Sequence, residues 1–435
     1  MIGEAESQRL IASAKAVLAA NQAGDSTKPS LNLYPHQWMW DSCFIAIGVS
    51  RYDPERAQTE LRAILRGQWS NGMVPQIIFN PASSGYFPGP ETWMSTRSPY
   101  APKSDETSGI TQPPVLATAA LAAYRNDPDR ARAEAFVREV FPKIKAYHEF
   151  LYRERNPDGS GLIVILHPWE SGLDNSPPYL DAGSRVTLTY KPRYTRLDTT
   201  HVSAANRPTD KDYDLFVWLL EKMRDVDYDW VRYLPEATLQ VEDVLVNAIL
   251  CRAGEDLEAL AVEAGAAGEM DELRSWRART AASMDAKLGD PQAGAYFSYD
   301  RVAGRPLTDL TISSLVPLYA SGLDQERAAP LIALMGNEAH FAPPEGFRCP
   351  TTALDSKRFN PENYWLGPVW LNTNWLLIHG LRAHGAAAEA DRLRDDTLAL
   401  ISRSGFREYF NPFTGEGYGT DSFSWSAALT IDLLS

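Results

Sequence analysis

The amino-acid sequence predicts an all-α protein folded as a toroidal barrel of paired helices, and three observations support this prediction. Apolar residues recur at helical spacing in about a dozen segments, whereas strand patterns are few and short. Long loops rich in Gly, Pro, Asn and Trp separate the helices. No Ser/Gly-rich linker, change of composition or sequence repeat divides the 435 residues. We therefore expect one domain over residues 1–435, although length alone would suggest about three.

Helical patterns run from the beginning of the sequence to its end. Within the first 22 residues, Leu10, Ala14 and Leu18 recur at helical spacing. Segment 54–68 follows Asp53, which can cap a helix, and has a proline at its first position. Strands are predicted only at 162–166, 295–299 and 417–418. Further helices are predicted at residues 114–124, 131–155, 215–226, 237–264, 270–288, 325–334, 364–384, 387–403 and 424–434.

The longest loops are predicted at residues 72–113, 167–213 and 340–363. Loops of this length in a compact protein are usually lids or binding loops. We expect them to gather at one mouth of the barrel, with segments 84–107 and 185–212 as lids that order around a ligand. A helical-repeat solenoid is the alternative fold, but such proteins normally show a sequence period of about 34–47 residues.

Composition excludes several classes of protein. The 42 Lys and Arg residues against 56 Asp and Glu give a net charge of −14, which disfavours binding to nucleic acid or to an anionic membrane surface. The three cysteines are far apart, which indicates reduced thiols and a cytoplasmic protein. The N-terminus is too charged for a signal peptide, and no apolar run approaches the ~20 residues of a membrane helix.

Cofactor motifs are also missing from the sequence. It contains no CxxC or Cys/His cluster for zinc, no GxGxxG and no P-loop, so we expect neither a metal nor an organic cofactor. A serine hydrolase is disfavoured because Ser171 is not in a GxSxG motif. The expected partner is a small molecule, and the sequence leaves assembly into a homo-oligomer open.

Aromatic residues are the most unusual feature, with 12 Trp, 19 Tyr and 15 Phe. Trp38, Trp40 and Asp41 lie within the motif YPHQWMWDS, which begins at Tyr34 and leads into an apolar helix. Indole faces cover the C–H patches of a sugar ring, and carboxylates accept hydrogen bonds from its hydroxyls, so this motif predicts a sugar subsite. The alternative is that Asp41 caps the helix and the indoles belong to the core.

A second motif, HPWESGLDNSP, spans residues 167–177. It places Glu170 and Asp174 next to Trp169 in a segment broken by glycine and proline. A carboxyl group against an indole is a suitable general acid, because the apolar neighbour raises its pKa. The alternative is an Asx-turn at Asp174 and a solvated Glu170.

A third motif, NPFTGEGYG, begins at residue 411 and is followed by FSWS. Glu416 lies between two glycines, whose backbone can approach a ligand closely, so Glu416 is the candidate base and Asp421 the second choice. The alternative is an ordinary turn. Two carboxylates in separate Trp-rich loops fit glycoside hydrolysis, which needs an acid and a base but no cofactor.

These motifs, together with NYWLGPVWLN at residues 363–372, resemble glycoside hydrolase family 63, and most closely its small bacterial mannosylglycerate and glucosylglycerate hydrolase type. The resemblance covers residues 34–426. It implies an (α/α)6 barrel and an inverting mechanism, with Asp174 as general acid and Glu416 as general base. It also implies a set of substrate-binding residues: Tyr34, Trp38, Trp40, Asp41, Gln112, Trp169, Gly172, Tyr364, Trp365 and Trp370.

The substrate implied by the resemblance is an α-glycosylglycerate, in the first place 2-O-α-mannosylglycerate. Tyr86, Arg207 and Tyr213 lie outside the tight motifs and are predicted to serve the lids and the glycerate end. An arginine suits that end because a guanidinium pairs with a carboxylate through two hydrogen bonds. A trehalase-like enzyme or an α-glucosidase for small neutral oligosaccharides is the enzymatic alternative, and a sugar-binding scaffold is the non-enzymatic one. The choice between mannose and glucose stays open.

Overall fold

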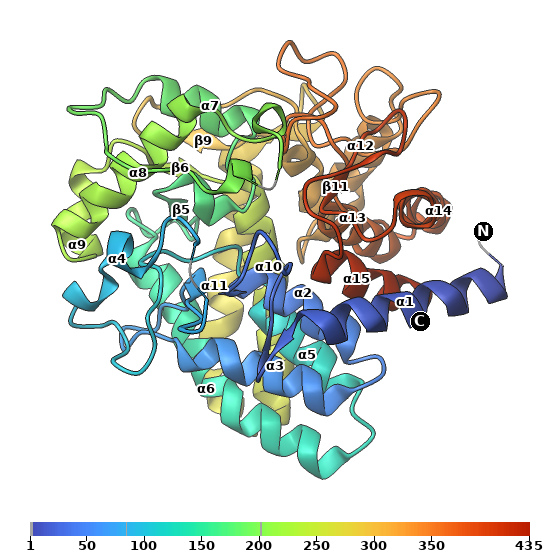
Figure 1. Ribbon diagram of the computed structural model, residues 1–435, viewed down its shortest axis with the longest axis horizontal. Helices are drawn as coiled ribbons and strands as arrows, with labels where there is room; N and C mark the ends of the chain where they lie inside the picture. The colour runs from blue at the N-terminus through green and yellow to red at the C-terminus, as the bar shows by residue number, and fades with distance from the viewer. Residues whose placement is uncertain (1–2, 84, 201) are drawn as a thin grey trace.

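The computed structural model describes residues 3–83, 85–200 and 202–435, and helices dominate it (Figure 1). Six of its elements form a closed inner ring. In this ring α2 packs on α5, α5 on α10, α10 on η8, η8 on α13, α13 on α15, and α15 on α2. The bounds of these elements are α2 Met39–Val49, α5 Leu116–Arg125, α10 Val244–Glu263, the 3-10 helix η8 Ile312–Tyr319, α13 Leu371–Ala383 and α15 Ser424–Leu434.

An outer layer of helices covers this ring. Helix α1 packs on α15, α3 on α2 and α5, α6 on α5 and α10, α11 on α10, α12 on η8, and α14 on α13 and α15. Figure 1 shows α1 and α15 side by side near both chain termini. The predicted (α/α)6 barrel is confirmed. The bounds of the outer helices are α1 Glu4–Asn21, α3 Pro54–Arg66, α6 Arg130–Glu154, α11 Met270–Ser283, α12 Gln325–Met335 and α14 Ala387–Ser404.

The sequence explains which helices lie inside. Every residue of α2 is buried, as expected for a helix that is apolar on all sides. In α3, by contrast, Ala57, Leu61 and Ile64 are buried, whereas the polar residues Arg56, Thr59 and Arg62 are partly exposed. Asp53 caps α3 as predicted, because its carboxylate accepts a hydrogen bond of 3.0 Å from the backbone N–H of Arg56.

The strands are two residues long and lie between the helices. Strand β3 (Gln37–Trp38) pairs with β4 (Ile77–Ile78), and β11 (Tyr409–Phe410) pairs with β12 (Gly417–Tyr418). A four-stranded antiparallel sheet has the order β10-β9-β6-β5, from Arg305–Pro306, Tyr299–Asp300, Val241–Glu242 and Val164–Ile165. Two further hairpins join β1 (Gln22–Ala23) to β2 (Ser26–Thr27) and β7 (Gly289–Asp290) to β8 (Ala295–Tyr296). Strand structure is therefore present within each of the three predicted segments.

Several boundaries differ from the sequence predictions. Helix α13 begins at Leu371 and not at residue 364, because Pro368 disfavours helical backbone in the residue before it. The inner element η8 was not predicted, since eight residues that include Pro317 give a weak helical pattern. Helix α8 starts at Asp210, where a capping box at Thr209 and Asp212 begins it, and not at residue 215.

The predicted loops also contain short helices. The first loop contains α4 Pro90–Trp93 and η1 Ser95–Arg97. The second contains η2 Pro168–Ser171, α7 Pro177–Ser184, η3 Asp198–Thr200, η4 Ala204–Asn206 and the start of α8 Asp210–Asp225. Outside these loops lie the short elements α9 Trp230–Tyr233, η5 Leu234–Glu236, η6 Ala267–Glu269 and the π-turn Met284–Leu288. The predicted lids include Ser84 and His201, which lie outside the described residues.

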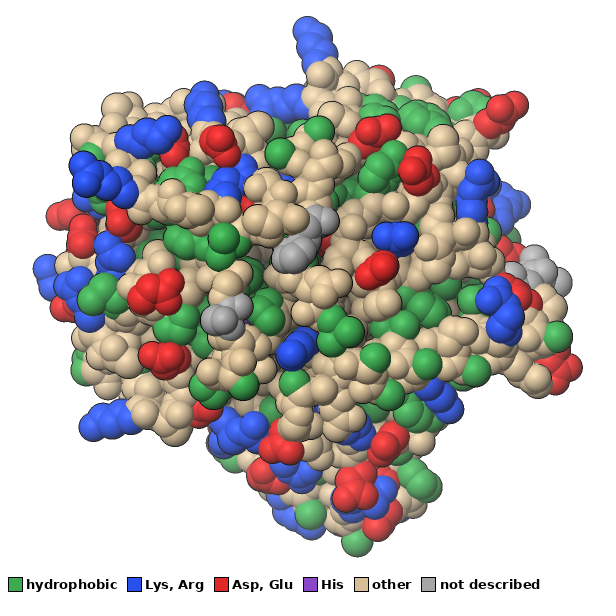
Figure 2. Space-filling model, in the orientation of Figure 1, with side chains coloured by type: hydrophobic (Ala, Val, Ile, Leu, Met, Phe, Trp, Pro, Cys, Tyr) green, Lys and Arg blue, Asp and Glu red, His purple; other side chains and the backbone are tan. Residues whose placement is uncertain are grey.

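Other expectations concern the surface and the cysteines. None of the described helices is both long and apolar enough to cross a membrane. The three cysteines, Cys43, Cys251 and Cys349, are buried and unpaired. Among the described residues no group of three or more His, Cys, Asp or Glu side chains could hold a metal ion. Acidic and basic side chains are interspersed over the face seen in Figure 2.

Candidate active site

A cavity of about 90 Å³ lies where several inner elements begin. Trp40 and Asp41 are in the first turn of α2, and Trp425 is in the first turn of α15. Gln112 precedes α5, and Trp370 immediately precedes α13. All of the predicted substrate-binding residues line this cavity: Tyr34, Trp38, Trp40, Asp41, Tyr86, Gln112, Trp169, Gly172, Arg207, Tyr213, Tyr364, Trp365 and Trp370. Asp174 lines it as well, whereas Glu416 does not.

Aromatic rings form the walls of the cavity. The rings of Trp365 and Trp370 are stacked with centroids 3.7 Å apart, and Tyr409 packs on the other side of Trp370 at 4.8 Å. Trp38 is held by the pairing of β3 with β4, in which it lies opposite Ile77. The cavity therefore has broad, rigid apolar surfaces of the kind that cover a sugar ring.

Gly172 is required by close packing in the second motif. Its φ is +73°, and a Cβ added there would lie 2.5 Å from the ring of Trp40. Only glycine fits both the left-handed backbone and this approach. The turn at Gly172 thus brings the Asp174 segment against the indole that follows β3.

Asp174 has the properties of a general acid. It is partly buried, and this burial raises the pKa of its carboxyl to about 7, although Arg207 acts in the opposite direction. The following residue, Asn175, fixes the segment: it accepts a hydrogen bond from the backbone N–H of Trp365 (3.0 Å) and donates one to Asn363 (2.8 Å). At neutral pH a substantial fraction of Asp174 therefore carries the proton that an acid catalyst must donate.

Glu170, the other carboxylate of this motif, is neither solvated nor in the cavity lining. It forms a fully buried ion pair with Arg155, with distances of 2.8 and 3.1 Å, and accepts the backbone N–H of Leu166 at 2.8 Å. The guanidinium of Arg155 also lies over the ring of Trp230 at 3.9 Å. Glu170 anchors the motif, and its alternative interpretation as a solvated residue is not supported by this geometry.

Glu408 is a further carboxylate in the cavity lining, beside Asp41 and Asp174, and it was not predicted from the sequence. It is buried, and it accepts hydrogen bonds from the Tyr34 hydroxyl (2.8 Å) and the backbone N–H of Thr420 (3.2 Å). Its Oε1 lies 3.5 Å from Nη1 of Arg207. The pKa of Glu408 is raised above its ordinary value because burial outweighs the opposite effects of Arg207 and the hydrogen bonds. In its ionised form, a carboxylate that lines the cavity in this way can accept a proton from water.

The structure does not bring Glu416 to the site. Its side chain is exposed and accepts a hydrogen bond from the Tyr418 hydroxyl at 3.2 Å. Asp421 is exposed too. The reason lies in the β11–β12 hairpin: Tyr409 pairs with Tyr418, so Glu408 lies at the base of the hairpin and Glu416 near its tip. The third motif thus belongs to the hairpin that reaches the cavity, but it is Glu408 and not Glu416 that lines the cavity. An available signal for Glu408 was the single carboxylate in the aromatic segment FREYF at residues 406–410.

Other polar groups in the lining also bear on ligand binding, and two of these residues, Gln76 and Trp93, were not predicted from the sequence. The side-chain oxygen of Gln76 and the indole nitrogens of Trp93, Trp365 and Trp425 are buried, and none has a hydrogen-bond partner among the described residues. Buried polar groups are normally paired, so these atoms suit the hydroxyls of a bound polyol. Asp41 is buried as well, and burial together with the nearby Glu408 and Glu60 raises its pKa well above the usual range.

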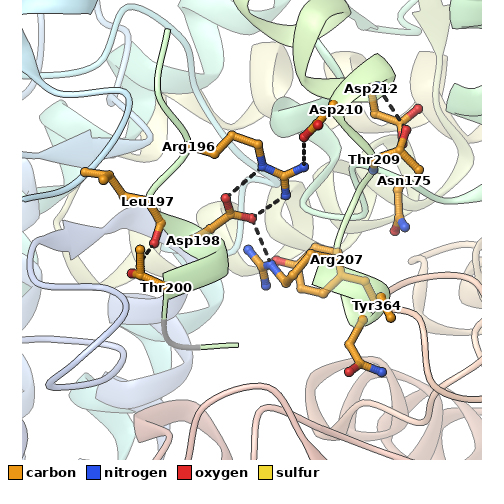
Figure 3. Close-up of polar contacts among 12 residues, drawn as sticks. Asn175, Arg196, Leu197, Asp198, Thr200, Arg207, Thr209, Asp210, Asp212 and Tyr364 are labelled. Carbon is orange, nitrogen blue, oxygen red and sulfur yellow. Dashed lines mark hydrogen bonds and ion pairs between the residues drawn. The ribbon is translucent and has the colours of Figure 1, made fainter. Parts of the chain in front are cut away.

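A buried cation completes the site. Arg207 donates to the Tyr34 hydroxyl at 3.0 Å and lies over the ring of Tyr364 at 4.2 Å. Figure 3 shows it beside Asp198 and Tyr364. The cavity thus combines three carboxyl groups, those of Asp41, Asp174 and Glu408, with aromatic walls and one arginine. Such a set can provide the acid and the base for cleavage of a glycoside with an anionic leaving group.

Comparisons with known proteins agree with this chemistry. The model of the mannosylglycerate hydrolase MGH1-like glycoside hydrolase domain matches residues 34–426. A mannosylglycerate hydrolase from Thermus thermophilus is 44% identical over 95% of this chain and 98% of its own, and a glucosylglycerate hydrolase from Mycolicibacterium hassiacum is 36% identical over 98% of both. A crystal structure of a GH63 mannosylglycerate hydrolase, also from Thermus thermophilus and in complex with Tris and D-glycerate, is 43% identical, has a TM-score of 0.91, and covers 97% of this chain and 99% of that one.

Proposed function

This chain belongs to glycoside hydrolase family 63, in the group of mannosylglycerate hydrolase-like enzymes, and we propose that it hydrolyses an α-glycosylglycerate to the free sugar and glycerate with inversion at the anomeric carbon. The observation that carries this proposal is the pair Asp174 and Glu408 in one aromatic cavity that also contains a buried arginine. The higher identity to four mannosylglycerate hydrolases (38–44%) than to the glucosylglycerate hydrolase (36%) supports 2-O-α-mannosylglycerate as the substrate.

The sugar would occupy the Trp-lined part of the cavity. Trp365, Trp370 and Trp425 provide apolar faces, and two of them have an indole N–H without a partner among the described residues. Asp41 and Gln76 add acceptors for hydroxyl groups.

The glycerate would lie against Arg207, Tyr86 and Tyr213, which line both this cavity and an adjoining outer one. Its carboxylate is the only charge on the substrate, and a guanidinium recognises it through parallel N–H groups. We propose that segments 84–107 and 185–212, which carry Tyr86 and Arg207, close over the substrate as lids. The buried, unpaired cysteines support a reducing, cytoplasmic location.

The mechanism uses one carboxylate on each side of the bond. Asp174 donates its proton to the glycosidic oxygen as the bond to the anomeric carbon breaks, so glycerate leaves with a neutral hydroxyl. Glu408 takes a proton from a water molecule whose oxygen bonds to the anomeric carbon from the opposite face. The α-linked substrate then yields the β-anomer of the sugar, and we expect the two carboxyls to be about 6.5–9.5 Å apart. Glu408 replaces Glu416 as the proposed base.

A panel of substrates tests this function. The enzyme is incubated with mannosylglycerate, glucosylglycerate, trehalose and kojibiose, and Asp174→Asn is the inactive control. We expect release of sugar from the glycerate substrates, highest from mannosylglycerate, and the β-anomer as the first product in proton NMR. Faster cleavage of trehalose or kojibiose would favour a trehalase-like enzyme or an α-glucosidase, and the α-anomer would exclude inversion.

A further inference from the structure

The carboxylate of Asp198 joins two arginines beside the active site. It accepts hydrogen bonds from Nε and Nη2 of Arg196, at 3.0 and 2.8 Å, and from Nε of Arg207 at 3.3 Å (Figure 3). The exposed fractions of these side chains are only 9%, 9% and 5% for Asp198, Arg196 and Arg207. Burial alone would raise the pKa of the Asp198 carboxyl, but the two arginines outweigh this effect and lower it. Asp198 therefore carries a charge at neutral pH.

Each of these arginines also covers a tyrosine of the cavity. Arg207 lies over the ring of Tyr364 at 4.2 Å, and Arg196 lies over the ring of Tyr213 at 3.9 Å. Tyr364 and Tyr213 both line the catalytic cavity, whereas Asp198 lines the outer cavity of about 460 Å³. One carboxylate outside the catalytic cavity thus holds two cation–π pairs that form part of its wall.

The contacts of Arg207 leave part of its guanidinium available. Its Nε edge faces Asp198, and Nη1 donates to the Tyr34 hydroxyl at 3.0 Å and lies 3.5 Å from Oε1 of Glu408. No described residue accepts a hydrogen bond from Nη2. A guanidinium has five N–H groups in a fixed plane, so fixing the Nε edge also fixes the direction of the remaining donors. Because the substrate carboxylate would meet these donors, their orientation decides how well it binds.

We propose that Asp198 is a positioning residue that makes the enzyme selective for a leaving group with a carboxylate, acting through Arg207 and with Arg196 as its counter-charge. This proposal rests on the proposed function, since it assumes that Arg207 binds the glycerate. Asp198 itself does not contact the substrate. Its bidentate pairing with Arg196 neutralises its charge, so that it orients Arg207 without repelling the substrate anion.

The test compares a glycosylglycerate with the corresponding glycosylglycerol, in which a neutral CH₂OH replaces the carboxylate. In Asp198→Asn we expect KM for the glycerate substrate to rise about tenfold, with kcat within threefold of wild type and the kinetics of the glycerol substrate changed less than twofold. Asp198→Ser should behave alike, and Asp198→Glu, which keeps the charge, should recover part of the preference. In an Arg207→Met background, Asp198→Asn should have no further effect on either substrate.

Asp210 provides the matched control. Its carboxylate also pairs with Arg196, at 3.0 Å, but its side chain is 85% exposed and Arg207 is not among its partners. Asp210→Asn should leave the kinetics of both substrates unchanged. If the wild-type enzyme turns over both substrates with equal KM, it does not select a leaving group with a carboxylate, and the proposed function is refuted. A wild type that prefers glycerate while Asp198→Asn and Asp198→Ser keep that preference, or lose activity equally on both substrates, would overturn the role of Asp198 alone.

Discussion

Replacing Asp174 by asparagine should make the protein more stable at alkaline pH while abolishing activity. The folded protein raises the pKa of this carboxyl from an ordinary 3.8 to about 7, chiefly because burial disfavours the charged form. Above pH 7 the folded state must therefore hold a buried charge that the unfolded chain holds in water. The difference between the two pKa values corresponds to about 4 kcal/mol of lost stability.

The sign of this effect sets its pH window. Below pH 3.8 the carboxyl is protonated in both states, so it causes no loss of stability; the loss grows between pH 3.8 and 7 and is complete above pH 7. An asparagine does not titrate. The gain in stability of Asp174→Asn over wild type should therefore be about 3 kcal/mol larger at pH 8 than at pH 5.

Urea denaturation at pH 5 and pH 8 measures this difference. Comparing two pH values cancels any change in packing that the substitution causes, because that change is present at both. Glu416→Gln serves as the control, since Glu416 is exposed, and should give the same difference from wild type at both pH values. An Asp174→Asn variant whose advantage over wild type does not grow from pH 5 to pH 8 would refute the raised pKa and, with it, the assignment of Asp174 as the acid.

Two further predictions concern the acid and its supporting turn. Because only protonated Asp174 can act as the acid, kcat/KM should fall about tenfold between pH 6 and pH 8, around the pKa of about 7; a flat profile over this range in initial-rate assays would contradict it. Gly172→Ala should lower the free energy of unfolding by about 1–3 kcal/mol from backbone strain. It should also reduce kcat/KM, because the new Cβ would lie 2.5 Å from the ring of Trp40. Gly159 is the control, because its φ is similar at +69° but a Cβ added there would have nothing within 4 Å. In Gly159→Ala, urea denaturation should show a loss of stability from backbone strain, while activity should be unchanged. Equal activity of the two variants would exclude a role for the contact with Trp40.

The barrel was predictable because its helices carry strong local patterns. Asp53 before a proline marks the start of α3, and the run of apolar residues after Asp41 marks an inner helix. The element η8 was not predictable in the same way, because its eight residues are placed by packing between α10 and α13 and not by a helical period. Local sequence thus determines the helices, while the ring that they close depends on contacts between distant segments.

The active site shows the same limit. Trp40, Trp365 and Asp174 stand in dense motifs, so the sequence identified them, and the structure places them in one cavity. Glu408 was missed because its burial results from the hairpin that pairs Tyr409 with Tyr418 and from contacts with Tyr34 and Arg207, which are hundreds of residues away. The glycine-flanked Glu416 has the stronger local pattern, but the turn that these glycines permit carries it to the surface. The contacts of Asp198 with Arg196 and Arg207 likewise depend on how segment 185–212 folds.

The most direct test of the account is the kcat of Glu408→Gln compared with that of Glu416→Gln on mannosylglycerate. Both substitutions remove one carboxylate from the same hairpin, one at its base in the cavity and one near its exposed tip. If Glu408 activates the water, kcat should fall about a thousandfold in Glu408→Gln and stay within twofold of wild type in Glu416→Gln. Near-normal turnover by Glu408→Gln, with loss of turnover in Glu416→Gln, would contradict the assignment of the base.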